Sequence, residues 1–131
     1  MKKFLIGAAA VAFAAGIAVA AEGPVGARRT ELQQSPIPGT KFIAFIMKAD
    51  FDKGGTTNWH THPGEELGVA TGGQLTVQVK GQPDRVIKTG ESFRVPANTP
   101  HNGIAGGEGY AGTHTYIVES DKPFATPVAK P

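Results

Sequence analysis

Hydrophobic and polar residues alternate along several short stretches of the chain. The clearest stretch is QLTVQVK, residues 74–80, in which Leu75, Val77 and Val79 alternate with polar residues. A period of two places one set of side chains on the buried face of a β-strand and the other set on its solvent face. No stretch after residue 20 repeats apolar residues at the helical spacing, so the pattern predicts very little helix.

Other short stretches have the length and composition of strands, with turn-forming residues between them. The predicted strands are residues 41–49, 57–62, 66–71, 74–80, 85–88, 92–95 and 112–119. Gly72-Gly73 is predicted to form a two-residue hairpin turn, because glycine adopts positive φ angles readily. Short strands at this spacing favour an all-β sandwich or barrel. Five residues outside the stretch 74–80 are predicted to pack in its core: Phe42, Phe45, Ile46, Phe93 and Val95.

The N-terminus has a different composition. Residues 1–20 begin with Lys2 and Lys3, continue as an apolar stretch rich in Gly and Ala, and end in small residues at Ala18 and Ala20. These features predict a secretory signal peptide. A retained membrane anchor is the alternative, but the apolar stretch is short for a spanning helix. We therefore expect a periplasmic or secreted protein with no membrane attachment after cleavage.

Proline and glycine mark both ends of the mature chain. Residues 21–39 contain three prolines and three glycines, which predicts an extended N-terminal arm. Residues 120–131 also hold three prolines and are predicted to form a flexible C-terminal tail. Residues 40–119 then form a single domain.

Charge and cysteine content exclude several classes of function. Two of the thirteen Lys and Arg residues lie in the predicted signal peptide, which leaves eleven basic residues against eleven acidic ones. The mature chain has no basic run beyond Arg28-Arg29, so nothing indicates binding to nucleic acid. Because there is no cysteine, disulfides and thiolate chemistry are excluded. Stability must come from a core, a metal or a partner subunit.

The stretch WHTHPGEE contains the most specific candidate chemistry. His60 and His62 lie one residue apart, so on a strand they share a face and are about 6.5–7 Å apart along the backbone. If the alternation continues through Pro63-Gly64, Glu66 lies on the same face and Glu65 faces solvent. A bulge at Pro63-Gly64 would exchange the two carboxylates. His101 is the candidate fourth ligand for a metal bound by these residues.

These residues fall within two spaced motifs. The first has the spacing G-x5-H-x-H-x3-E-x6-G and the second has the spacing G-x5-P-x4-H. Their residues are Gly54, His60, His62, Glu66 and Gly73, then Gly90, Pro96 and His101. Together they resemble the two motifs of the cupin superfamily over residues 40–119, and in particular small exported single-domain cupins. Two positions depart from that pattern: Asn98 stands where the family usually has Gly, and Ala105 stands where it has Asn.

The resemblance implies a single conserved β-barrel of the jelly-roll, or double-stranded β-helix, type. It also implies one divalent metal ion held by His60, His62, Glu66 and His101, the same set that the residue pattern selects. Three imidazoles and one carboxylate leave two positions open on an octahedral ion, which suits Fe, Mn, Ni or Cu. Zn is an alternative at a lower coordination number.

The residues around Glu66 suggest how the site is used. Gly68 and Ala70 continue its face of the strand, so they either leave space for a ligand or close a tapering barrel. Leu67 and Val69 face the other way, where exposed apolar side chains would indicate a homodimer contact or cover by the N-terminal arm. His114 is predicted to have a structural role.

Three classes of function remain open. The first is a mononuclear metal enzyme acting on a small molecule, of dioxygenase, isomerase or decarboxylase type, with Glu66 as the candidate catalytic base. The second is an exported protein that binds a small ligand through its metal without transforming it. The third is a purely structural metal, which is disfavoured because structural sites usually fill the coordination sphere with protein atoms.

Overall fold

The computed structural model describes residues 21–131, and the predicted signal peptide at residues 1–20 lies outside this part. All the regular structure in the described part is β-strand, as the alternation predicts. The strands are β1 (Val25–Pro36), β2 (Phe42–Thr56), β3 (His60–Thr61), β4 (Gly64–Val79), β5 (Arg85–Lys88), β6 (Ser92–Val95), β7 (His101–Glu119) and β8 (Thr126–Pro127). Residues 21–131 contain no helix long and apolar enough to cross a membrane.

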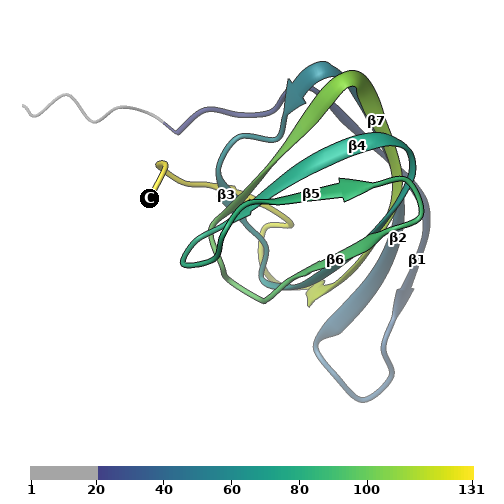
Figure 1. The fold of residues 1–131 in the computed structure, drawn as a ribbon. Coiled ribbons are helices and arrows are strands. Elements are labelled where there is room, and N and C mark those ends of the chain that lie inside the picture. The colour runs from purple at the N-terminus through teal and green to yellow at the C-terminus, as the bar shows by residue number, and fades with distance from the viewer. Residues whose placement is uncertain (1–20) are drawn as a thin grey trace, which may run out of the picture.

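The strands form one sheet that curls on itself (Figure 1). The long strand β7 pairs antiparallel with β2 on one side and with β4 on the other. β1 extends the sheet beyond β2, while β5 and β6 both pair with β4. β3 lies between β7 and β8. This is the all-β barrel that the sequence predicts.

β4 corrects the prediction of a hairpin at Gly72-Gly73. The strand runs through both glycines, and its register with β7 shifts between Ala70 and Gly72 and again between Gly73 and Leu75. Gly73 has a φ of 61°, which a residue with a side chain rarely adopts. A bulge of this kind bends a strand without ending it. The bend allows β4 to follow the curve of the barrel.

The predicted arm and tail are both part of the sheet. Residues of the arm form β1, which pairs with β2 over most of its length. Of its three prolines, Pro24 precedes this edge strand, Pro36 is its last residue and Pro38 follows it, so no missing N–H falls inside the strand. In the tail, β8 pairs with β3, and the N–H of Val128 donates to the carbonyl of Trp59.

The core follows the period-two pattern in β4 but not in the predicted part of β2. Leu75, Val77 and Val79 are buried, as are Phe93 and Val95, which confirms those predictions. Among the remaining predicted core residues, Phe42 and Phe45 are only partly buried, and Ile46 is 38% exposed. The prediction for Ile46 is wrong because alternation along β2 turns other residues inward: Met47, Ala49 and Phe51.

Candidate metal centre

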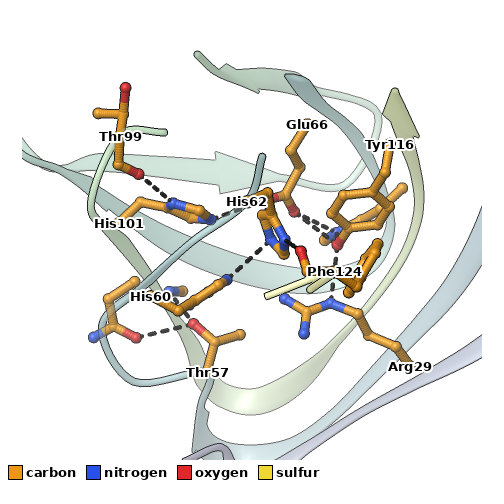
Figure 2. A network of polar contacts seen from close by, with 12 residues as sticks. Arg29, Thr57, His60, His62, Glu66, Thr99, His101, Tyr116 and Phe124 are labelled. Atoms are coloured by element: carbon orange, nitrogen blue, oxygen red, sulfur yellow. Dashed lines mark hydrogen bonds and ion pairs between the residues drawn. The ribbon is translucent and has the colours of Figure 1, made fainter. Parts of the chain in front are cut away.

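Four predicted ligands converge inside the barrel. One donor atom from each of His60, His62, Glu66 and His101 lies within 4.8 Å of the others, and all four residues are buried. Figure 2 shows the three imidazoles and the carboxylate pointing toward one another. His60 in β3 pairs directly with His101 at the start of β7, so backbone pairing brings together two motifs that are far apart in the chain.

The structure places Glu66 inside the barrel and Glu65 outside. Glu66 is 3% exposed, whereas the carboxylate of Glu65 accepts two hydrogen bonds from the exposed side chain of Arg94, at 2.7 and 2.9 Å. The alternation therefore continues through Pro63-Gly64. Arg94 also holds the pKa of Glu65 below its usual value, so this carboxylate remains ionised at the surface.

Backbone carbonyls fix the orientation of all three imidazoles. The Nδ1–H of His60 donates to Asn58 O at 2.8 Å. The same atom of His62 donates to Phe124 O at 2.7 Å, and that of His101 donates to Thr99 O at 2.8 Å. A carbonyl oxygen can only accept, so each Nδ1 carries a proton. Each Nε2 is then free to point inward, as in many histidine ligands of metals.

The inward atoms are crowded in a way that favours a cation. Nε2 of His60 lies 3.1 Å from Nε2 of His62, while Glu66 Oε2 lies 3.0 Å from Nε2 of His101. Burial and the neighbouring His101 lower the pKa of His60 to about 3, so its Nε2 carries a lone pair. A lone pair beside a second imidazole nitrogen needs a proton or a metal ion between them. The donor set fits a divalent transition metal.

The outer oxygen of Glu66 is held by two residues outside the proposed ligand set. Oε1 accepts hydrogen bonds from the Tyr116 hydroxyl at 3.0 Å and from His114 Nδ1 at 2.9 Å. Tyr110 in turn donates to His114 Nε2 at 2.8 Å. Burial by itself would raise the pKa of Glu66, but its close polar contacts, led by that with His101, hold it well below the usual value. His114, for which the sequence predicts a structural role, thus positions the carboxylate.

Arg29 is the residue that sequence reasoning missed most completely. It lies in β1, within the predicted arm, and its Nε donates to the Tyr116 hydroxyl at 2.9 Å. Together with His60 and Glu66 it lines one cavity. Burial would lower the pKa of Arg29, but Tyr116 and Glu66 raise it overall, so the guanidinium stays charged. The sequence contains no local signal for this position beyond the Arg28-Arg29 pair.

Of the two alternatives for Gly68, space for a ligand or closure of the barrel, the structure supports closure. A Cβ on Gly68 would collide with the ring of Phe93, so that glycine makes room for an aromatic side chain and not for a ligand. The cavity at the centre has instead Arg29, Thr57 and Asn102 in its wall and a volume of about 10 Å³. That is enough for about one water molecule.

The C-terminal tail completes the site. The Phe124 carbonyl orients His62, and its ring packs against Tyr116 and His62 at centroid distances of 4.8 and 4.9 Å. Residue Asn98, at the position where cupins usually have Gly, has a φ of 55°. Its N–H donates to the carbonyl of His62 at 2.9 Å, so this departure from the motif supports the site.

Comparison with known proteins establishes the family. A profile of the cupin domain matches residues 47–118, more than half of the chain, so the protein belongs to the cupin superfamily. No curated protein matches the chain. Among solved structures, a cupin-like protein from Thermotoga maritima is 21% identical with a TM-score of 0.65 and covers 79% of this chain and 77% of its own.

Two further structures have similar folds. KdgF from Halomonas sp. is 21% identical with a TM-score of 0.61, and the match covers 73% of this chain and 82% of KdgF. An oxalate oxidase in complex with the substrate analogue glycolate is 28% identical with a TM-score of 0.61. That match covers 79% of this chain and 55% of the oxidase, so the present chain spans about half of its length.

Proposed function

We propose that this cupin binds one divalent transition metal ion, Fe, Mn, Ni, Cu or Zn, through His60, His62, Glu66 and His101. The single observation that carries the proposal is the fixed tautomer of the three imidazoles. Each Nδ1 is bound to a backbone carbonyl, so each Nε2 is available at a common point beside a buried carboxylate. Burying three imidazole nitrogens and a carboxylate costs free energy unless they bind a cation or protons.

We further propose that the protein is an enzyme acting on a small molecule, of dioxygenase, isomerase or decarboxylase type. A bound ion would supply Lewis acidity at an oxygen atom of the substrate. Tyr116 and His114 hold the Glu66 carboxylate through hydrogen bonds to its outer oxygen. Apolar side chains such as Leu75 and Val77 line part of the cavity and limit the access of water to it. The similarity to an oxalate oxidase that binds glycolate supports a small, oxygen-rich substrate.

The role of catalytic base suggested for Glu66 stays a prediction. Its low pKa makes it a weak proton acceptor, its Oε1 already accepts hydrogen bonds from Tyr116 and His114, and its Oε2 lies beside the inward nitrogens of two proposed ligands. Its geometry supports the role of ligand more directly. A proton acceptor for the reaction would then come from the substrate or from solvent.

A binding protein without turnover is the second candidate. In the described residues, each histidine and tyrosine near the centre already has a hydrogen-bond partner. The cavity is also small, with a volume of about 10 Å³. These observations favour capture of a small ligand over a reaction that needs free acid and base groups.

Metal analysis tests the shared part of both candidates. Protein purified without chelator, from cultures supplied with each candidate metal, is expected to hold about one ion per chain. His62→Ala should reduce that content sharply. Only trace metal in the wild type would reject the site. Enzyme and binder are then separated by incubating metal-loaded protein with a mixture of small molecules, because product beyond one equivalent per chain requires turnover.

Export and self-association are proposed on separate grounds. The composition of residues 1–20 supports export to the periplasm or the medium. The side chains of Leu67 and Val69, 43% and 39% exposed on the outer face of β4, support a homodimer. The mass of the mature chain tests the first proposal. Sedimentation of the wild type against Leu67→Lys tests the second, because a charge on that face should shift a dimer to monomer.

A further inference from the structure

Arg29 has donors that no residue of the described chain uses. Its Nε is bound to Tyr116, but its two terminal nitrogens make no hydrogen bond or ion pair within residues 21–131. No buried side-chain nitrogen or oxygen in this part lacks a partner, so these nitrogens are accessible and are not sealed in the core. A guanidinium fork with free donors is suited to a planar anion, which it binds through two parallel hydrogen bonds.

The cavity around Arg29 would carry more positive than negative charge once a metal ion is bound. Among residues 21–131, the only Asp, Glu, Lys or Arg side chains that line the cavity are Arg29 and Glu66. With a divalent ion in place, the ion and Arg29 together would carry three positive charges against the single negative charge of Glu66. The Oε1 atom of Glu66 already accepts hydrogen bonds from Tyr116 and His114. Uncompensated charge in a largely apolar cavity favours the entry of an anion.

We propose that Arg29 forms the anion subsite of the metal centre and that the ligand or substrate is a small carboxylate. This inference rests on the proposed metal site and adds the chemical class of its ligand. The carboxylate pairs with the terminal nitrogens of Arg29, while Tyr116 fixes the guanidinium by accepting from Nε. Figure 2 shows Arg29 beside Tyr116, below the histidine cluster. The cavity has a volume of about 10 Å³, room for about one water molecule, so the surrounding side chains must move apart to admit the ligand.

The adjacent Arg28 provides a matched control. It lies on the same strand but is exposed, and its guanidinium already forms two hydrogen bonds to Asp52, at 3.0 and 2.8 Å. Arg28→Gln therefore removes the same net charge as Arg29→Gln without changing the cavity. Any general electrostatic effect of losing one arginine appears in both variants, and a subsite effect appears in only one.

The experiment is calorimetric titration of metal-loaded protein with glycolate and with its neutral amide, glycolamide. We expect the wild type and Arg28→Gln to bind glycolate alike and more tightly than glycolamide. Arg29→Gln should bind glycolate about 10- to 100-fold more weakly, which corresponds to the loss of charged hydrogen bonds. Arg29→Lys, which keeps the charge but not the fork, should lose less affinity and guards against misfolding of the glutamine variant.

Several outcomes would overturn the subsite. They are wild-type affinity for glycolate in Arg29→Gln, equal losses in both arginine variants, no preference for glycolate over glycolamide, or no glycolate binding by the metal-loaded wild type. Metal content is measured on each sample first. Failure of the wild type to load metal would overturn the proposed function, whereas normal loading with any of these results overturns only the role of Arg29.

Discussion

Two buried clusters share the interior of the barrel, and β4 contributes to both. The apolar cluster includes Leu75, Val77 and Ile87, whose side chains are held together by van der Waals packing. The polar cluster, made of the four predicted ligands with Tyr116 and His114, contains Glu66 from the same strand. Alternation along one strand therefore buries apolar side chains in one half and a charged group in the other.

The two clusters should respond differently to substitution. When an apolar side chain is shortened, it loses local packing contacts. Its apolar neighbours can stay buried, because they need no hydrogen-bond partner. In the polar cluster each group satisfies another, so removal of one leaves a buried partner without its hydrogen bond or charge. The comparison predicts that apolar substitutions change stability alone, whereas polar ones change the response to metal.

The largest effect is expected from the metal itself. A divalent ion at about 1,000 times its dissociation constant should stabilise the wild type by about 4 kcal/mol. His62→Ala should lose most of this gain, because it removes one of the buried donor atoms. Thermal unfolding with metal and with chelator measures both quantities. An equal metal-induced rise in Tm for the variant would contradict the assignment of His62.

A core truncation tests the other cluster. Ile87 is fully buried in β5 and does not line the cavity. Ile87→Ala should lower the free energy of unfolding by about 3 kcal/mol, from lost burial and the cavity left behind. Denaturant unfolding with and without metal provides the check. The stabilisation by metal should match that of the wild type, and a smaller value would mean that the two clusters are coupled.

A substitution behind the carboxylate should have an intermediate effect. Tyr116→Phe keeps the ring but removes the hydroxyl that donates to Glu66. We expect metal affinity to fall by about 10- to 100-fold, as for other groups that orient a ligand. The control is Tyr110→Phe, since Tyr110 reaches Glu66 only through His114. Competition titration with a coloured chelator ranks the variants, and a larger loss for Tyr110→Phe would argue against this hierarchy.

The smallest effect is expected one residue away from the ligand. Glu65→Gln removes only a solvent-exposed pair with Arg94, and such pairs contribute little. Metal content and Tm should equal those of the wild type. Glu66→Gln should lose the metal, because an amide replaces the buried carboxylate. Loss of metal in Glu65→Gln would mean that the strand changes phase at Pro63-Gly64 in solution.

Local patterns in the sequence predicted the all-β fold correctly. The predictions were wrong where one local pattern is compatible with two structures. Gly72-Gly73 suits a hairpin turn and a bulge in a continuous strand equally, and only the pairing of β4 with β7 selects the bulge. Ile46 lies in a run of apolar residues whose phase is ambiguous. The arm was predicted to be extended, but nothing in its own composition indicates that it pairs with β2.

The candidate site likewise has a part that the sequence predicted and a part that it did not. The structure brings together the four predicted donor residues, and their role as ligands remains our proposal. Arg29, His114, Tyr116 and Phe124 were not predicted to meet there. They come from three separate segments, and none of them lies at a motif position. Their contacts with the site depend on the pairing of β1, β2 and β7 and on the path of the tail.

The sequence by itself determined that His60, His62 and Glu66 point to the same side of the chain, because side-chain direction in an extended backbone alternates from residue to residue. Only the tertiary structure decided which side chains lie next to the Glu66 carboxylate. Registers between strands that are far apart in the chain place Tyr116 and Arg29 there. Those registers are set by the summed packing and hydrogen bonding of whole strands, which no short stretch of residues contains.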